Sequence, residues 1–162
     1  MAPISVGDSF NGIADYMAIR NLLLAHAAVY RMYKAKYFAE QRGKISSLCF
    51  DTSGYFPINP DLKEDREAVK RAYDFTIGFY AQPLKDGKFP QSVIDGIAET
   101  NNIENISLTR LVQFNEKEQE QLRGSYDFIA FNYYESSKVT PMKKTDYNDK
   151  TTLKDRDIGL QR

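Results

Sequence analysis

Two acidic residues follow the two segments that look most like strands. Asp51 comes after the apolar run 44–50, and Glu135 after the aromatic run 126–134. Parallel strands bring their C-terminal ends to one edge, so both carboxyls are expected on one face. Glycoside hydrolysis uses such a pair, about 5–5.5 Å apart for retention and about 6.5–9.5 Å for inversion. The alternative, which we favour, is that Asp51 caps a turn before Gly54 and Glu135 is a solvated loop residue.

His26 is the one histidine of the chain and Cys49 the one cysteine. These counts exclude a histidine-based metal cluster and an internal disulfide. The two side chains could form a thiol–imidazole pair, but an apolar helix and a strand are more typical places for packed, hydrogen-bonded core groups. The glycine spacing matches neither a dinucleotide-binding nor a P-loop motif. We therefore expect no metal and no cofactor.

Charge and hydropathy limit the partners. The chain has 22 basic and 22 acidic residues, so no net field attracts nucleic acid or anionic lipid. No apolar run approaches the roughly 18 residues of a membrane span. We expect neither a nucleic-acid nor a membrane partner. Residues 1–10 show no secretory signal, which leaves localisation open, and the sequon Asn105-Ile-Ser107 matters only on a secretory route.

Periodicity and turn residues divide the chain into four helices and two strands. Helices are expected at about 11–42, 65–81, 90–100 and 115–124, and strands at 44–50 and 126–134. Asn115-Glu-Lys-Glu118 has the spacing of a capping box, and Gln82-Pro83 is expected to stop the second helix. After Val139 the composition turns to lysine, aspartate and threonine, which predicts that 140–162 is a surface loop or tail.

The order strand, helices, strand predicts a right-handed crossover in a parallel α/β sheet. Two strands do not close a core, and a (β/α)₈ barrel needs at least about 200 residues. Residues 1–162 are therefore expected to form one incomplete segment of a (β/α)₈ TIM barrel, with parallel strands and crossover helices. Open strand edges at 45–50 and 128–132 predict a homodimer or a partner chain that covers them.

Several segments resemble glycoside hydrolase family 1, which includes β-glucosidases and myrosinases. In chain order they are Asn21-Leu-Leu-Leu-Ala-His-Ala27, Gly43-Lys-Ile45, Ala72-Tyr-Asp-Phe75, Gly78-Phe-Tyr-Ala-Gln-Pro83, Gly87-Lys-Phe-Pro90, Phe114, Gly124-Ser-Tyr-Asp-Phe128 and Phe131-Asn-Tyr-Tyr134. The resemblance covers nearly the whole chain, and within the family it is to animal enzymes of the insect type. It implies a barrel slice from about the fourth helix to just past the sixth strand.

The resemblance implies a retaining hydrolase of β-glucosides or thioglucosides. In the family, the acid/base glutamate stands in an Asn-Glu-Pro motif and the nucleophile in a Glu-Asn-Gly motif. Neither motif occurs in the 162 residues, since Glu104-Asn105 is followed by Ile106. The resemblance therefore implies no catalytic residue here, and an inactive chain when it is alone.

The resemblance also points to two site residues. Tyr134 is similar by motif position to the family tyrosine that hydrogen-bonds the nucleophile carboxylate, and Asn132 lies close to the sugar subsite. Relatives often carry a tryptophan after the first of these strands, where this chain has Gly54 and Tyr55. A competing hypothesis is a non-enzymatic half-barrel that binds a sugar or another protein.

Overall fold

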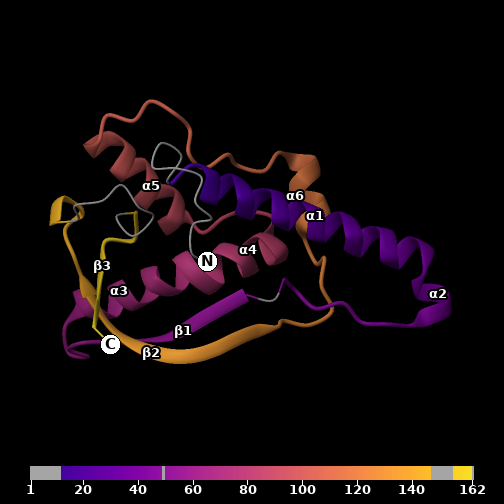
Figure 1. Cartoon of the computed structure of the whole chain (residues 1–162), viewed down its shortest axis with the longest axis horizontal. Helices are drawn as coiled ribbons and strands as arrows, with labels where there is room; N and C mark the ends of the chain where they lie inside the picture. Colours follow the sequence, from indigo (N-terminus) through magenta and orange to yellow (C-terminus); the bar gives the residue numbers. More distant parts are fainter. Residues whose placement is uncertain (1–11, 49, 147–154, 162) are drawn as a thin grey trace.

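The computed structural model describes residues 12–48, 50–146 and 155–161 (Figure 1). Its helices are α1 (Ala14–Lys36), α2 (Phe38–Gln41), α3 (Lys63–Tyr73), α4 (Phe79–Asp86), α5 (Gln91–Ile103) and α6 (Glu116–Leu122). Its strands are β1 (Phe50–Pro57), β2 (Phe131–Pro141) and β3 (Ile158–Gln161). A π-helical turn, Asp74–Gly78, joins α3 to α4, and a 3₁₀ turn, Lys144–Asp146, follows β2. No described helix is long and apolar enough to cross a bilayer.

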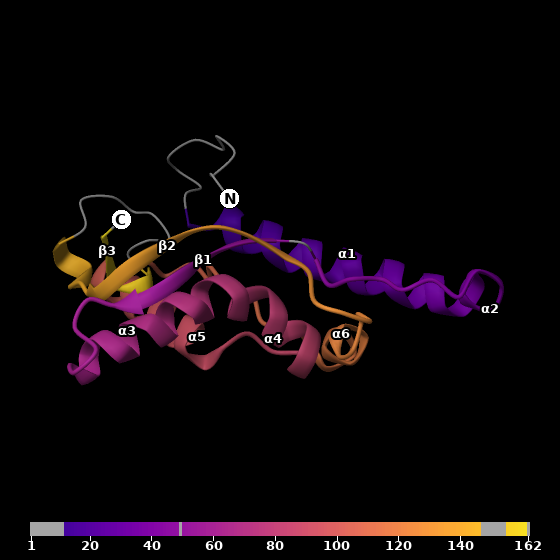
Figure 2. The same ribbon diagram turned by 90° about the horizontal axis from the view of Figure 1, so that it is seen from below.

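The sheet has the order β1-β2-β3. β1 and β2 pair in parallel, from Phe50 opposite Phe131 to Pro57 opposite Val139, whereas β3 pairs antiparallel with β2. Helices α3, α4 and α5 lie on one side of β1 and β2 (Figure 2). They belong to the chain segment that connects the two parallel strands. The predicted α/β class, with parallel strands and crossover helices, is confirmed.

Both parallel strands lie further along the chain than predicted. Within the described part of 44–50, pairing before Phe50 is limited to one bridge between Ser46 and Phe128. β1 instead runs through the expected turn at 51–54, and β2 continues past Tyr134 to Pro141. The prediction followed the apolar residues, whereas backbone pairing with a neighbour extends into polar residues as well.

The helix predictions are largely confirmed, with corrections at their ends. The first helix is interrupted at Tyr37, and its last turn, α2, ends at Gln41 with Arg42 as its left-handed cap (φ 54°). The expected start of this helix at residue 11 lies outside the described residues. Pro83 does not stop the second helix but lies inside α4. Its side chain is fully buried, as is Leu84, so packing outweighs the lost backbone hydrogen bond.

Helix α6 begins with the predicted capping box. The Asn115 side chain accepts a hydrogen bond from the Glu118 backbone at 3.0 Å, and the Glu118 carboxylate accepts one from the Asn115 backbone at 3.0 Å. These reciprocal bonds satisfy two donors that would otherwise be free at the start of the helix.

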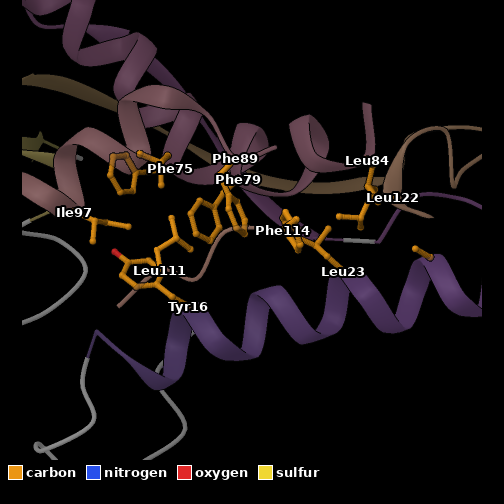
Figure 3. Packing of buried hydrophobic residues seen from close by; sticks show 12 residues of the cluster. Tyr16, Leu23, Phe75, Phe79, Leu84, Phe89, Ile97, Leu111, Phe114 and Leu122 are labelled. Atoms are coloured by element: carbon orange, nitrogen blue, oxygen red, sulfur yellow. The ribbon is translucent and has the colours of Figure 1, made fainter. Parts of the chain in front are cut away.

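The larger hydrophobic core lies among the helices (Figure 3). Its centre is a stack of phenylalanines, with ring centroids 5.0 Å apart for Phe79 and Phe89 and 4.7 Å for Phe89 and Phe114. α1 closes this core with Leu23 and Ala27, neither of which is exposed. The helical layer therefore has a core of its own.

A smaller core joins the sheet to α3. It contains Tyr55 from β1, Val139 from β2, Ile158 from β3, and Ala68 and Ala72 from α3. This core is the place where the helical layer is attached to the sheet.

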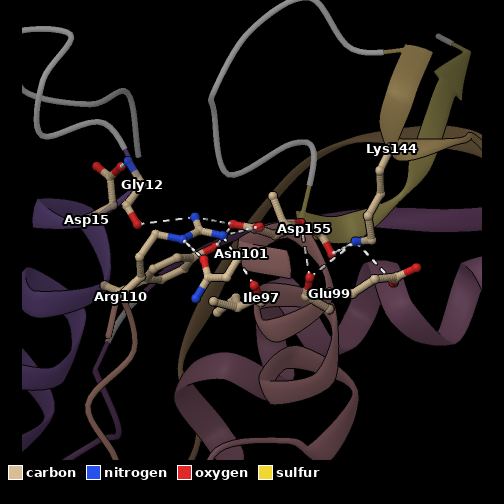
Figure 4. Close-up of polar contacts among 11 residues, drawn as sticks. Gly12, Asp15, Ile97, Glu99, Asn101, Arg110, Lys144 and Asp155 are labelled. Atoms are coloured by element: carbon tan, nitrogen blue, oxygen red, sulfur yellow. Dashed lines mark hydrogen bonds and ion pairs between the residues drawn. The ribbon is translucent and has the colours of Figure 1, made fainter. Parts of the chain in front are cut away.

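A buried ion pair ties distant parts of the chain together (Figure 4). The Arg110 guanidinium donates to both carboxylate oxygens of Asp155, at 2.6 and 3.0 Å, and these side chains are 4% and 0% exposed. Tyr16 on α1 donates to the same carboxylate at 2.5 Å, and burial together with Asp155 raises the pKa of the Tyr16 phenol well above its usual value. Arg110 also donates to Asn101 on α5 at 2.6 Å, and Lys144 donates to the Asp155 carbonyl at 3.0 Å.

The sequence predicts a surface loop or tail at 140–162. Several described residues of this range are instead packed into the fold. Asp155 is buried in this ion pair, Ile158 is 4% exposed, and β3 joins the sheet. Its charged composition suggested exposure, but an aspartate can be buried when a guanidinium satisfies its charge.

Asp127 anchors the segments that lead into the strands. Its carboxylate accepts hydrogen bonds from Lys34 at 2.8 Å, Tyr30 at 3.2 Å and the Ile45 backbone at 2.8 Å. Its backbone N–H in turn donates to the Ile45 carbonyl at 2.8 Å. The bonds from Lys34 and the Ile45 backbone lower the pKa of the Asp127 carboxyl.

We expect Asp155→Asn to lower the free energy of unfolding by about 3–5 kcal/mol, because Arg110 is left buried without its counter-charge. Urea unfolding of the purified chain measures the change. Glu67→Gln is the matched control, since it breaks the exposed pair with Lys63 and is expected to cost no more than about 1 kcal/mol. Equal losses in the two variants would contradict the structural role of the buried pair.

Asp127 predicts a pH dependence of stability. Because its folded pKa is depressed, the carboxylate stabilises the fold above its unfolded value, about pH 4, and this contribution is lost as pH falls further. The urea midpoint of the wild type should therefore fall more steeply below about pH 4 than that of Asp127→Asn. Asp61→Asn, at an exposed turn, is the control and should keep the wild-type profile. Parallel profiles for wild type and Asp127→Asn would contradict the prediction.

Candidate functional site

The candidate site lies where β1 and β2 pair over 51–54 and 132–136. Asp51 and Asn132 are cross-strand partners, and the Asn132 amide donates to the Asp51 carboxylate at 2.9 Å. Both side chains are exposed. The expected turn cap at Asp51 is therefore wrong, because Asp51 is a strand residue whose carboxylate accepts from the neighbouring strand.

A β-bulge follows directly after this pair. Thr52 lies opposite Tyr133 and Gly54 opposite Ser136, so one residue of β1 spans the same length as Tyr134 and Glu135 of β2. Glu135 is therefore a strand residue and not the loop residue expected from the sequence. In this register Asp51 lies opposite Asn132, and Glu135 lies within the bulge. The carboxyls of Asp51 and Glu135 are therefore not cross-strand partners. Bulges bend a strand and re-aim its side chains.

Tyr134 is the most exposed large hydrophobic side chain of the described residues, at 76%. Neighbouring Tyr133 is 54% exposed, and its hydroxyl contacts the Ser136 hydroxyl. The two predicted site residues, Asn132 and Tyr134, thus lie two positions apart on one strand, both exposed. Their chemistry is hydrogen bonding: an amide donates and accepts, and a phenol donates to a carboxylate.

Gly54 and Tyr133 are residues whose part in this geometry the sequence reasoning missed. Gly54 looked like a turn residue, but it lies inside β1, where a Cβ would come within 2.9 Å of the Tyr133 hydroxyl oxygen. A glycine within an extended run is the signal that could have shown a close approach.

The remaining candidate residues lie away from this surface. The His26 Nε2–H donates a hydrogen bond to the Ser125 carbonyl at 2.7 Å, which agrees with the packed, hydrogen-bonded alternative. Cys49 lies outside the described residues. Asn105 of the sequon is exposed in a left-handed turn (φ 53°) after α5. In the described part of the chain, no three His, Cys, Asp or Glu residues gather as they would to hold a metal ion.

Known proteins resemble the chain in sequence over most of its length. The family model described as "Glycosyl hydrolase family 1" matches residues 4–160. "Beta-glucosidase 38" of Oryza sativa subsp. japonica is 40% identical over 119 residues, which is 74% of this chain and 22% of that protein. "Furcatin hydrolase" of Viburnum furcatum is 38% identical over 128 residues, which is 78% of this chain and 21% of that protein.

Solved structures resemble the fold. A rice β-glucosidase superposes with a TM-score of 0.81 at 27% identity, covering 93% of this chain and 29% of that one. An aphid myrosinase also gives 0.81 at 27% identity, covering 93% of this chain and 32% of that one. The chain thus spans about a fifth to a third of the length of these relatives. Its strands and crossover helices form part of a (β/α)₈ barrel, and the chain belongs to glycosyl hydrolase family 1.

Proposed function

We propose that this chain supplies part of the active-site wall of a retaining β-glycosidase that acts on β-glucosides, with thioglucosides as the alternative substrate. The relatives carry the names β-glucosidase, furcatin hydrolase and myrosinase, which supports the substrate class. The observation that carries the proposal is the exposure of Asn132 and Tyr134 side by side on β2, free for contact with a ligand.

A retaining glycosidase uses two carboxyl groups, one as nucleophile and one as acid and then base. The 162 residues contain neither the Asn-Glu-Pro nor the Glu-Asn-Gly motif of the family. The two carboxyls therefore come from other parts of a complete barrel, and this chain alone is inactive.

In the assembled barrel Tyr134 acts on the nucleophile. A phenol that donates a hydrogen bond to a carboxylate favours its ionised form, which is the form that attacks the anomeric carbon. The Asn132 amide forms a hydrogen bond with a sugar hydroxyl. Its NH₂ group also donates to the Asp51 carboxylate, and this bond holds the amide in one orientation. Each residue thus has a separate task in the same subsite.

Activity tests this proposal. The purified chain should not hydrolyse an aryl β-glucoside, whereas the chain mixed with polypeptides that supply the rest of a family 1 barrel should do so. In that assembly Tyr134→Phe should lower kcat about 10- to 100-fold, because a hydrogen bond to a charged group contributes about 1.5–3 kcal/mol. Tyr37→Phe, on an exposed tyrosine beside α2, is the control. Turnover by the chain alone that Tyr134→Phe lowers would contradict the proposal.

A second candidate function rests on a different observation. Residues 128–134 expose Phe128, Ile129, Phe131, Tyr133 and Tyr134, each between 48% and 76%. A strand that is apolar on both faces is typical of parallel sheets covered on both sides. β3 pairs with β2 only at 138–141, so among the described strands the edge of β2 before Lys138 is free on that side. This arrangement favours a protein-binding half-barrel whose free edge accepts a strand from a second copy.

Self-association tests this second candidate. Analytical ultracentrifugation should show a concentration-dependent dimer, and Phe131→Lys in β2 should shift it to monomer, because a lysine on a strand edge opposes edge-to-edge pairing. Val112→Lys changes a side chain of similar exposure in a loop and should leave the dimer intact. A monodisperse wild-type monomer with cooperative unfolding would argue against this candidate.

A further inference from the structure

Tyr133 and Tyr134 are adjacent and chemically identical, yet their surroundings differ. The Tyr133 hydroxyl contacts Ser136, three residues along the same strand, and its ring edge occupies the space next to a Cβ position on Gly54. The Tyr134 side chain is 76% exposed. A feature of the fold therefore determines which of the two neighbouring phenols is accessible to a ligand.

The space at Gly54 makes this distinction. A Cβ on Gly54 would lie 2.9 Å from the Tyr133 hydroxyl oxygen, 2.9 Å from the Ser136 hydroxyl oxygen and 3.2 Å from the Tyr133 ring. Gly54 is not among the described glycines with positive φ, which are Gly12, Gly87 and Gly124. Its backbone is therefore open to any residue, and the requirement for glycine is one of space.

The hydroxyl contact between Tyr133 and Ser136 spans the bulge. Tyr133 and Ser136 flank Tyr134 and Glu135, and the hydroxyl contact joins the two flanking residues across them. A slip of one residue in a strand moves every side chain to the other face. The contact between Tyr133 and Ser136 joins the two ends of the bulge in the space beside Gly54 and opposes that slip, which would exchange the places of the two tyrosines.

We infer that Gly54 and Tyr133 are positioning residues, which hold the bulge so that Tyr134 is the phenol presented to the ligand. The inference rests on the proposed function, in which Tyr134 meets the nucleophile carboxylate. It adds a requirement for that site. The Tyr133 hydroxyl and the space left by glycine at position 54 affect the site only through the position of Tyr134, and neither residue contacts the substrate.

Fluorine NMR of the chain labelled with 3-fluorotyrosine tests the inference. The chain has 11 tyrosines, and the variants Tyr133→Phe and Tyr134→Phe identify the two signals of interest. Gly54→Ala should displace or split the Tyr134 signal. Gly159→Ala is the matched control, because a Cβ on this β3 glycine would meet atoms only at 3.6 Å or beyond, and it should leave the Tyr134 signal in place.

Tyr133→Phe separates positioning from a merely structural role. It keeps the ring and removes only the hydroxyl that contacts Ser136, so the urea midpoint should stay close to that of the wild type. If Tyr133 positions its neighbour, the Tyr134 signal should still be displaced or split, and Ser136→Ala should have the same effect. These two variants also decide the matter if Gly54→Ala fails to fold. An unchanged Tyr134 signal in both of them overturns the inference.

The result is independent of glycosidase activity, because the spectra need no sugar and no assembled barrel. An unchanged Tyr134 signal overturns the positioning role and leaves the proposed function standing. Conversely, an assembled barrel in which Tyr134→Phe retains full activity overturns the proposed function, whatever the spectra show. In an active assembly, Gly54→Ala should lower kcat and should have little further effect when Tyr134→Phe is already present.

Discussion

The parallel pairing of β1 and β2 is the constraint on which the rest of the structure depends. Two parallel strands cannot be joined by a short turn, because the chain must return to the starting end of the sheet. Asp51 and Asn132 meet across this pair although they are 81 residues apart in sequence. The helices between them form that return, and α3 attaches it to the sheet through Ala68 and Ala72. The bulge, and with it the place of Tyr134, exists only because this pair has one register.

The elements with local signals could be predicted from the sequence. Asn115 and Glu118 satisfy each other within one helical turn, so their spacing was sufficient to place the start of α6. Pro83 and Asp155 depend instead on distant partners. A proline in a helix is tolerated when its side chain is buried, and an acidic residue in a charged segment is buried when an arginine 45 residues away donates hydrogen bonds to it. Neither partner is visible in a local window of sequence.

The candidate site divides in the same way. The motif around Asn132 and Tyr134 predicts that both belong to the site, and both are exposed on β2. Gly54 was taken for a turn residue because a local pattern of aspartate, threonine, serine and glycine is typical of turns. Its actual role depends on Tyr133, the residue that the register brings beside it from the other strand. A cross-strand contact of this kind needs the register, and the register follows from long-range pairing.

Burial is distributed unevenly between the two layers, and this links assembly to activity. The phenylalanine stack and Leu23 close a core among the helices, whereas residues 128–134 of the strand layer remain exposed. The helical layer therefore has a closed core, whereas this part of the strand layer presents apolar side chains at its surface. Tyr134 belongs to that same exposed run, so whatever polypeptide covers the run also decides what the phenol meets. Under the two proposed functions, the surface that binds a partner and the surface that serves catalysis lie on one strand, so a change in one function is expected to affect the other.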